Sequence, residues 1–229
     1  MGTIYQLGTS CHIEPFSKVY TPLNLLNIYE VRTKFPDSQI QSCLGEYVGI
    51  WYVWQYKRHN WVGFTSENQL VKGKSPVIFH NSDEVTQSLG RCVDLPEGPA
   101  PVDMLAWCMI NCRATWGVTV AHQAEICHPG INEISELIIG CRLPELDQGL
   151  YCNYFAMRWD TFDAYMRWSF PIVERMITMR DDPRVSVSKG HTSTLGGLVE
   201  RLPTIWLQKY HKTCLVLDGT NQEFYQGDS

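Results

Sequence analysis

The feature that most constrains the fold is an alternation along the chain between short apolar runs and longer segments with helical periodicity. The short runs, which predict strands, are residues 3–10, 61–65, 76–79, 149–157 and 213–217. The segments whose pattern favours helices are residues 44–57, 102–115, 130–140, 160–179 and 195–210. Strands that alternate with helices are typical of the α/β class, so we expect a mostly parallel central sheet flanked by helices.

Length and composition predict one domain. The chain has 229 residues, of which 44% are hydrophobic and 19% charged, as in an ordinary globular protein. This length is enough for one well-buried core and favours one core over two separate ones. We therefore expect a domain over residues 1–217 and a flexible tail over residues 218–229.

Charge and hydropathy exclude several functional classes. The net charge of −5 gives no broad cationic surface for nucleic acid. No apolar run reaches the roughly 20 residues of a transmembrane helix, and residues 1–10 do not resemble a signal peptide, so we expect a cytoplasmic protein. The nine cysteines are an odd number and lack paired zinc-finger spacing, so reduced thiols in the core are the expectation.

Small and polar residues follow two of the predicted strands. Gly8 and Thr9 end the first strand, and Ser66, Glu67 and Asn68 follow the strand at 61–65. Ligands of open α/β sheets bind at the carboxyl ends of strands, so these residues are candidates for a ligand loop. The alternative for the second group is a plain polar turn.

Four blocks of the sequence form a recognisable series. They are residues 46–54 (EYVGIWYVW), 63–70 (GFTSENQL), 152–157 (CNYFAM) with 162–165 (FDAY) and Trp168, and 196–202 (GGLVERL) with Trp206. These blocks resemble the DUF4422 family of bacterial and viral polysaccharide glycosyltransferases. The order and spacing of the blocks carry the resemblance more than any single block. In the second block only the glycine matches the family pattern.

The resemblance implies a single GT-A-like domain and a glycosyltransferase that transfers a hexose or deoxyhexose. The donor would be a nucleotide-diphosphate sugar, such as a UDP-sugar, and the acceptor a glycan or glycoprotein in polysaccharide biosynthesis or glycosylation. A viral member would work in the host cytoplasm. GT-A enzymes usually hold manganese or magnesium with an Asp-x-Asp motif, but here Glu67 is the one acid in residues 66–69, which puts metal dependence in doubt.

Several other residues are candidates for the functional site, and each also has an ordinary structural interpretation. Glu200 is the candidate general base, and Arg201 is a candidate contact for the donor phosphates. The structural alternative is that these two residues form an ion pair on the surface of a helix. Asn153 is a candidate donor-sugar contact, against a core amide, and Glu46 either supports the site or is a satisfied buried acid. His191, after Lys189 and Gly190, could meet the diphosphate, against a solvated loop, while Asp83 and Glu84 are a second acidic pair, more typical of a surface.

Two alternatives to the enzyme stay open. The missing Asp-x-Asp pair motivates a non-catalytic domain that binds nucleotide sugars or glycans, and a decayed site would leave a structural module. The sequence also leaves open the sugar, the acceptor, the oligomeric state, whether the chain is part of a longer protein and whether transfer inverts or retains the anomeric centre. We favour inversion, with Glu200 as the base.

Overall fold

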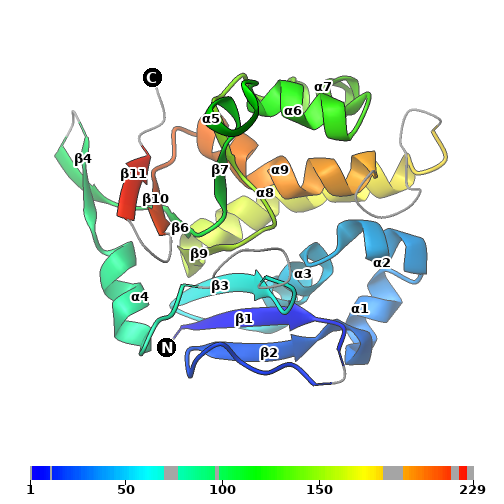
Figure 1. Ribbon diagram of the computed structural model, residues 1–229. Helices are drawn as coiled ribbons and strands as arrows, with labels where there is room; N and C mark the ends of the chain where they lie inside the picture. Colours follow the sequence, from blue (N-terminus) through cyan, green and yellow to red (C-terminus); the bar gives the residue numbers. More distant parts are fainter. Residues whose placement is uncertain are drawn as a thin grey trace.

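The computed structural model describes residues 2–10, 12–69, 77–95, 98–182, 193–217 and 222–225. In this part of the chain a seven-stranded sheet has the order β11-β10-β6-β9-β3-β1-β2 (Figure 1). Its strands are β1 (Thr3–Gly8), β2 (Tyr20–Asn24), β3 (Trp61–Ser66), β6 (Met104–Ala106), β9 (Phe155–Arg158), β10 (Cys214–Leu217) and β11 (Gln222–Tyr225). Two small antiparallel pairs stand apart from it: β4 (Cys92–Leu95) with β5 (Gly98–Pro101), and β7 (Met109–Asn111) with β8 (Gln148–Leu150).

The sheet is mostly parallel in strand direction. β1 pairs in parallel with β2 and β3, and β6 pairs in parallel with β10. β9 lies between β3 and β6 and is antiparallel to both, which leaves β3 and β6 pointing the same way. The carboxyl ends of β1, β3 and β6 therefore meet the amino end of β9 at one edge of the sheet. This edge positions the candidate site.

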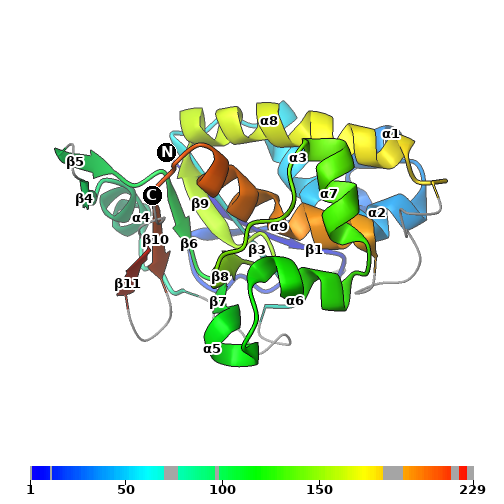
Figure 2. The same cartoon turned by 90° about the horizontal axis from the view of Figure 1, so that it is seen from above.

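Helices cover the two faces of the sheet unequally (Figures 1 and 2). The helices are η1 (Leu25–Asn27), α1 (Tyr29–Lys34), α2 (Ser38–Leu44), α3 (Tyr47–Tyr56), α4 (Ser82–Leu89), α5 (Cys112–Trp116), α6 (Val120–Cys127), α7 (Ile131–Ile139), α8 (Trp159–Thr178) and α9 (Thr194–Lys209). The larger core packs α3, α8 and α9 against alternate residues of the strands, such as Tyr5, Phe64 and Phe155. The smaller core joins the opposite face to α4.

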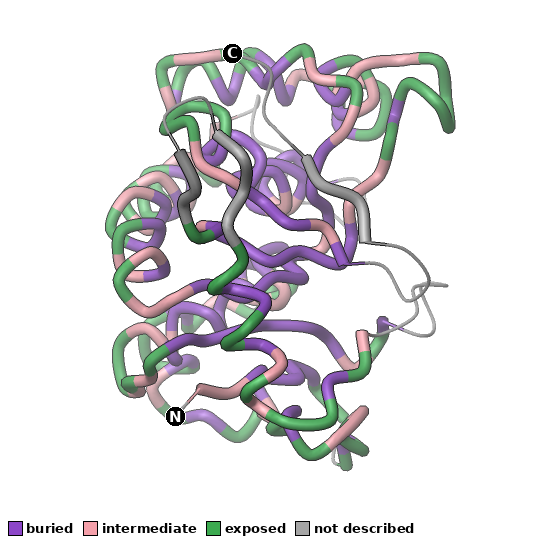
Figure 3. The backbone as a smooth tube through the Cα atoms, turned by 90° about the vertical axis from the view of Figure 1, so that its left-hand side faces the viewer, coloured by how far each residue is buried: buried purple, intermediate pink, exposed green. Residues whose placement is uncertain are grey.

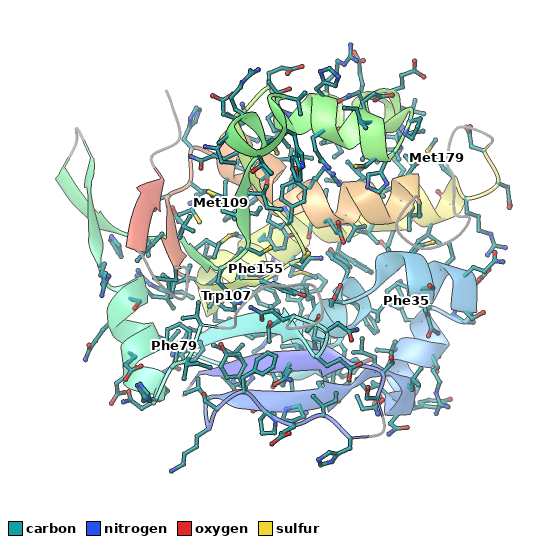
Figure 4. The ribbon with its side chains drawn as sticks, in the orientation of Figure 1. Phe35, Phe79, Trp107, Met109, Phe155 and Met179 are labelled. Atoms are coloured by element: carbon teal, nitrogen blue, oxygen red, sulfur yellow. The ribbon has the colours of Figure 1, made fainter. Side chains whose placement is uncertain are left out.

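Side-chain alternation explains why one sheet serves two cores. Ile4 belongs to the smaller core and its neighbour Tyr5 to the larger one, as expected when successive side chains of a strand point to opposite faces. On the smaller side, the rings of Phe79 and Trp107 meet edge to face with centroids 6.3 Å apart (Figure 4). Figure 3 shows buried residues concentrated along the central strands.

The structure confirms the α/β class and most of the predicted elements. Strands lie at Thr3–Gly8, Trp61–Ser66 and Cys214–Leu217 as predicted. The helices predicted at 44–57, 130–140, 160–179 and 195–210 correspond to α3, α7, α8 and α9. Helix α8 begins one residue earlier than predicted, with Arg158 as its N-cap residue and Asp160 in its first turn.

Three predicted elements were wrong. Residues 102–115 form β6, β7 and the short helix α5 instead of one helix, because Asn111 caps α5 by accepting a hydrogen bond from the Ala114 backbone N–H. Residues 77–79 form no strand. The strand predicted at 149–157 is two strands, β8 and β9, separated by a turn at Cys152 and Asn153 with positive φ angles of 65° and 54°.

Residues 222–225, within the predicted tail, form β11, which pairs antiparallel with β10. The domain boundary at residue 217 stays a prediction. Among the cysteines that the structure describes, Cys112, Cys127, Cys141 and Cys214 are free thiols. Within the described residues, no helix combines the length and the apolar character needed to cross a membrane.

Candidate active site

A cavity of about 560 Å³ opens at the edge where β1 and β3 end. Its volume is in the range of small-molecule sites. The wall contains Gly8, Thr9, Ser66, Glu67, Asn68, Asn153 and Glu200, together with Glu46, His128 and residues of η1, α2 and the start of α9. The first seven of these residues were predicted from the sequence as ligand contacts, metal ligand or base, and they lie around one cavity although they come from four separate parts of the chain.

Glu67 closes the loop that follows β1. Its Oε1 atom accepts hydrogen bonds from the backbone N–H groups of Thr9, at 2.7 Å, and Ser10, at 3.2 Å. Gly8 makes this approach possible, since a Cβ atom there would lie 2.3 Å from the Glu67 carboxyl carbon. Partial burial raises the pKa of Glu67, but the hydrogen bonds from Ser10 and Thr9 outweigh it and hold the pKa below its usual value. Glu67 is therefore an ionised group on the cavity wall.

Asn153 occupies a strained backbone position at the base of the cavity. Its φ of 54° is left-handed, as is that of Cys152 at 65°, and such positions in non-glycine residues occur often at functional sites. Asn153 is 3% exposed, and its Oδ1 atom has no hydrogen-bond partner among the described residues. A buried amide oxygen without a partner is costly. A ligand hydroxyl that donates to Oδ1 would remove this cost.

The first turns of α9 form the wall opposite the β1 loop. Ser193 caps the helix by accepting a hydrogen bond from the Gly196 backbone N–H. Glu200 lies one turn after Gly196, so both residues face the cavity. Gly196 and Gly197 allow close packing inside the protein. A Cβ atom at Gly196 would lie 2.8 Å from the Cys43 carbonyl oxygen of α2, and one at Gly197 would lie 2.6 Å from the His128 ring.

Arg201 does not line the cavity. Its side chain is 2% exposed, donates through Nη1 to the Gly197 carbonyl oxygen at 2.7 Å, and through Nη2 to Gln123 Oε1 at 2.8 Å. The guanidinium also lies over the Tyr151 ring, 5.1 Å from its centroid. The predicted contact with the donor phosphates is corrected accordingly: Arg201 points from α9 toward Gln123 of α6, because successive residues of an α-helix point about 100° apart and only Glu200 faces the cavity.

The remaining candidates fall elsewhere. His191 lies outside the described residues, as do Lys189 and Gly190. Asp83 and Glu84 lie in the first turn of α4, where Glu84 accepts hydrogen bonds from the His80 backbone and the Asn81 side chain, and neither lines the cavity. Glu46 precedes α3 and is on the cavity wall.

The sequence interpretation missed His128. This residue ends α6, is 6% exposed and contributes to the cavity wall beside Gly197. The packing of His128 on Gly197 joins segments 69 residues apart, and no local pattern signals such a contact.

The cavity wall is acidic. Glu46, Glu67 and Glu200 line it, whereas the described residues that line it include no lysine or arginine. Among the described residues, no group of three or more His, Cys, Asp or Glu side chains is arranged to hold a metal ion. A phosphate group entering this cavity therefore needs a cation supplied with it or by other residues, because like charges in a confined site repel strongly.

A cavity at the carboxyl ends of parallel strands is where α/β domains bind their ligands, and this domain has such a cavity. Among solved structures, the chain is similar to one described as the apo structure of the bifunctional glycosyltransferase WbbM. The TM-score is 0.56 and the sequence identity 16%, over 99% of this chain and 47% of that chain. The likeness shows that the two chains share a fold, and this chain spans about half the length of the similar chain. No family model and no curated protein sequence matches the chain, so membership of the DUF4422 family stays a prediction.

Proposed function

We propose that the protein is a glycosyltransferase that moves a hexose or deoxyhexose from a nucleotide-diphosphate sugar, such as a UDP-sugar, to a glycan. The acceptor would be a growing polysaccharide or the glycan of a glycoprotein. The observation that carries the proposal is the cavity at the carboxyl ends of β1 and β3, which unites seven separately predicted residues in a glycosyltransferase fold.

The residues divide by the part of the substrate that they would meet. Gly8, Thr9, Ser66 and Asn68, at the ends of the two parallel strands, would hold the nucleotide. Asn153 Oδ1, which lacks a partner among the described residues, would accept a hydrogen bond from a hydroxyl of the donor sugar. His191 stays a predicted diphosphate contact.

The acidic wall fits a donor that arrives with a divalent cation. Carboxylate oxygens such as those of Glu67 are ligands of manganese and magnesium, and such an ion would offset the charge that builds on the departing phosphate. Glu67 already accepts hydrogen bonds from two backbone N–H groups, so fewer of its oxygen lone pairs are left to coordinate an ion. We therefore propose that the cation is held mainly through the diphosphate.

Glu200 would act as the general base. Its carboxylate would take the proton of an acceptor hydroxyl as that oxygen bonds to the anomeric carbon. The bond from the anomeric carbon to the phosphate oxygen breaks in the same step, and the nucleotide diphosphate leaves with the bonding electron pair. This chemistry inverts the anomeric centre. In a retaining enzyme Glu200 would position the acceptor or donor instead.

A non-catalytic domain that binds a nucleotide sugar is the second candidate function. The observation in its favour is that Glu67, the one acid at the β3 end, is engaged by the Thr9 and Ser10 backbone. The decisive experiment measures release of nucleotide from a panel of UDP-, GDP- and dTDP-sugars, with and without manganese. Release that depends on the protein supports the enzyme. Thermal stabilisation by nucleotide without release supports the binding domain, and neither effect would support a structural module.

A further inference from the structure

A second cavity, of about 410 Å³, lies at the other end of α6 from the candidate active site. Its lining includes Arg113 of α5, Thr119 and His122 at the start of α6, Glu125, Asn132 of α7, and Glu145. Figure 2 shows α5, α6 and α7 grouped on one side of the molecule, and α6 packs on both of the others. None of these residues takes part in the chemistry proposed above.

The polar groups of this cavity are held in place by the fold. Glu125 accepts hydrogen bonds from the Gly130 backbone at 2.6 Å and from Asn132 Nδ2 at 2.9 Å. Arg113 is oriented by Asp147, with 3.0 Å between Nε and Oδ1, and Thr119 donates to Glu145. Side chains fixed in this way lose little conformational entropy when a ligand binds.

Asn132 supplies a second, independent sign of a ligand. It is 6% exposed, both of its amide hydrogen bonds are made by Nδ2, to Ala121 and Glu125, and its Oδ1 has no partner among the described residues. Glu125, Glu145 and Arg113 give the lining two negative charges against one positive charge. A phosphorylated or other anionic ligand is therefore disfavoured, whereas a neutral ligand rich in hydroxyl groups can use both donors and acceptors.

An exposed aromatic residue adjoins the cavity lining in the sequence. Trp116 is 50% exposed, lies three residues after Arg113 in α5 and directly precedes Gly117, which also lines the cavity. Residues three apart in a helix are neighbours on its surface, so Trp116 lies on the same face of α5 as Arg113. An apolar ring next to fixed hydrogen-bonding groups suits a sugar, which has an apolar ring face and polar edges.

We propose that this cavity, with Trp116 at its rim, binds a saccharide unit of the acceptor at a distance from the transfer point. The proposal rests on the proposed function for the identity of the ligand as an acceptor. The geometry supports it, because Thr119 caps the start of α6 in this cavity and His128 ends α6 in the active-site cavity. The eight residues of α6 lie between these two caps, and a rise of about 1.5 Å per residue places the caps roughly 13 Å apart, so an oligosaccharide along α6 would reach both.

The test is direct binding of oligosaccharides in the absence of any donor. Each of three sugars, maltotriose, cellotriose and tri-N-acetylchitotriose, is added separately to ¹⁵N-labelled protein. At least one of them should shift the NMR signals of the Trp116 indole N–H and of the Thr119 and His122 amides in a saturable way. Trp116→Ala and, separately, His122→Ala should each weaken that binding about tenfold, the loss expected for one contact of this kind. Tyr56→Ala is the matched control, since Tyr56 is 53% exposed and lies on α3.

The outcomes separate this inference from the proposed function. If none of the three sugars shifts these signals at millimolar concentration, or if both variants bind like the wild type, the inference is wrong even when sugar transfer is observed. If a sugar binds here but no transfer or nucleotide release occurs, the saccharide site stands and the enzyme proposal fails. In an active enzyme, Trp116→Ala should raise the KM for a long acceptor about tenfold and leave kcat and the KM for a monosaccharide acceptor unchanged.

Discussion

Glu200 is the residue on which the proposed chemistry depends most. It lies on the cavity wall one helical turn after Gly196, in the same cavity as the loop that follows β1. Glu200→Gln keeps the shape and removes the base, so transfer should fall by about 100-fold to 10,000-fold. Nucleotide affinity, measured by calorimetry, should stay near that of the wild type. A variant that transfers sugar at the wild-type rate would show that the carboxylate is structural.

Arg201, the next residue, should behave in the opposite way. It is buried and joins α9 to Gln123 of α6, so Arg201→Ala removes two charged hydrogen bonds and leaves the Gln123 amide oxygen with one donor fewer. We expect a loss of about 3 kcal/mol in the free energy of unfolding, and a fall in Tm of roughly 6 to 12 °C. Arg167→Ala is the control, because its side chain is 72% exposed and such ion pairs contribute less than about 1 kcal/mol. Equal Tm values for the two variants would contradict this assignment.

Glu67 should give the protein a pH-dependent stability. Its pKa in the folded protein lies below the ordinary value, so the fold favours the carboxylate. The resulting stabilisation is complete above the ordinary glutamate pKa of about 4.3 and is lost as the pH falls through the lower pKa of the folded state. Glu67→Gln should therefore be less stable than the wild type at pH 7, by less than about 1 kcal/mol because the group borders solvent, and equal to it near pH 3. Urea unfolding at both pH values tests this, and a difference that grows toward acid would refute it.

At the scale of elements, the cavity depends on how closely α9 approaches α2. Gly196 touches the Cys43 carbonyl, and backbone atoms cannot move aside as a flexible side chain can. Gly196→Ala should cost about 1 to 3 kcal/mol of stability and weaken nucleotide binding, because it pushes two cavity walls apart. In Gly90→Ala, the new Cβ would meet only ordinary contacts at 3.4 Å, so we expect no loss of stability or binding. Calorimetric unfolding and nucleotide titration of both variants make the comparison.

The elements that the sequence predicts well are those with a strong and unbroken period. The apolar positions of residues 160–179 and the run at 61–65 are set by burial against one core, and both predictions were confirmed. The prediction for 102–115 failed because two short strands with apolar residues on both faces lack a distinguishing period, and the Asn111 cap was overlooked. The break at Cys152 and Asn153 follows from left-handed backbone, which the apolar pattern around it does not reveal.

At the scale of the whole molecule, the parallel sheet explains why the site could be predicted in part. Strand ends of β1 and β3 must meet at one edge once both strands are parallel neighbours, so Gly8, Thr9, Ser66 and Asn68 were predictable together. The orientation of Arg201 and the contact of His128 with Gly197 depend on how α6 packs on α9. Such packing is decided by side-chain shape across distant segments, and the sequence of one chain does not specify it locally.

The acidic cavity predicts how UDP and manganese together change the thermal stability of the whole molecule. Three carboxylates line the cavity, and no described lysine or arginine does, so UDP alone should bind weakly and raise Tm little. Manganese alone should also raise Tm little, because the described residues include no preformed group of three acidic, histidine or cysteine ligands. Together they should stabilise the fold by more than the sum of the separate effects, reaching about 2.7 kcal/mol when the complex is present at 100 times its Kd. Uridine, which has no phosphate, is the control and should show no dependence on manganese. Stabilisation by UDP that is equal with manganese and with a chelator would mean that protein cations alone hold the diphosphate, and the proposed role of the metal would be wrong.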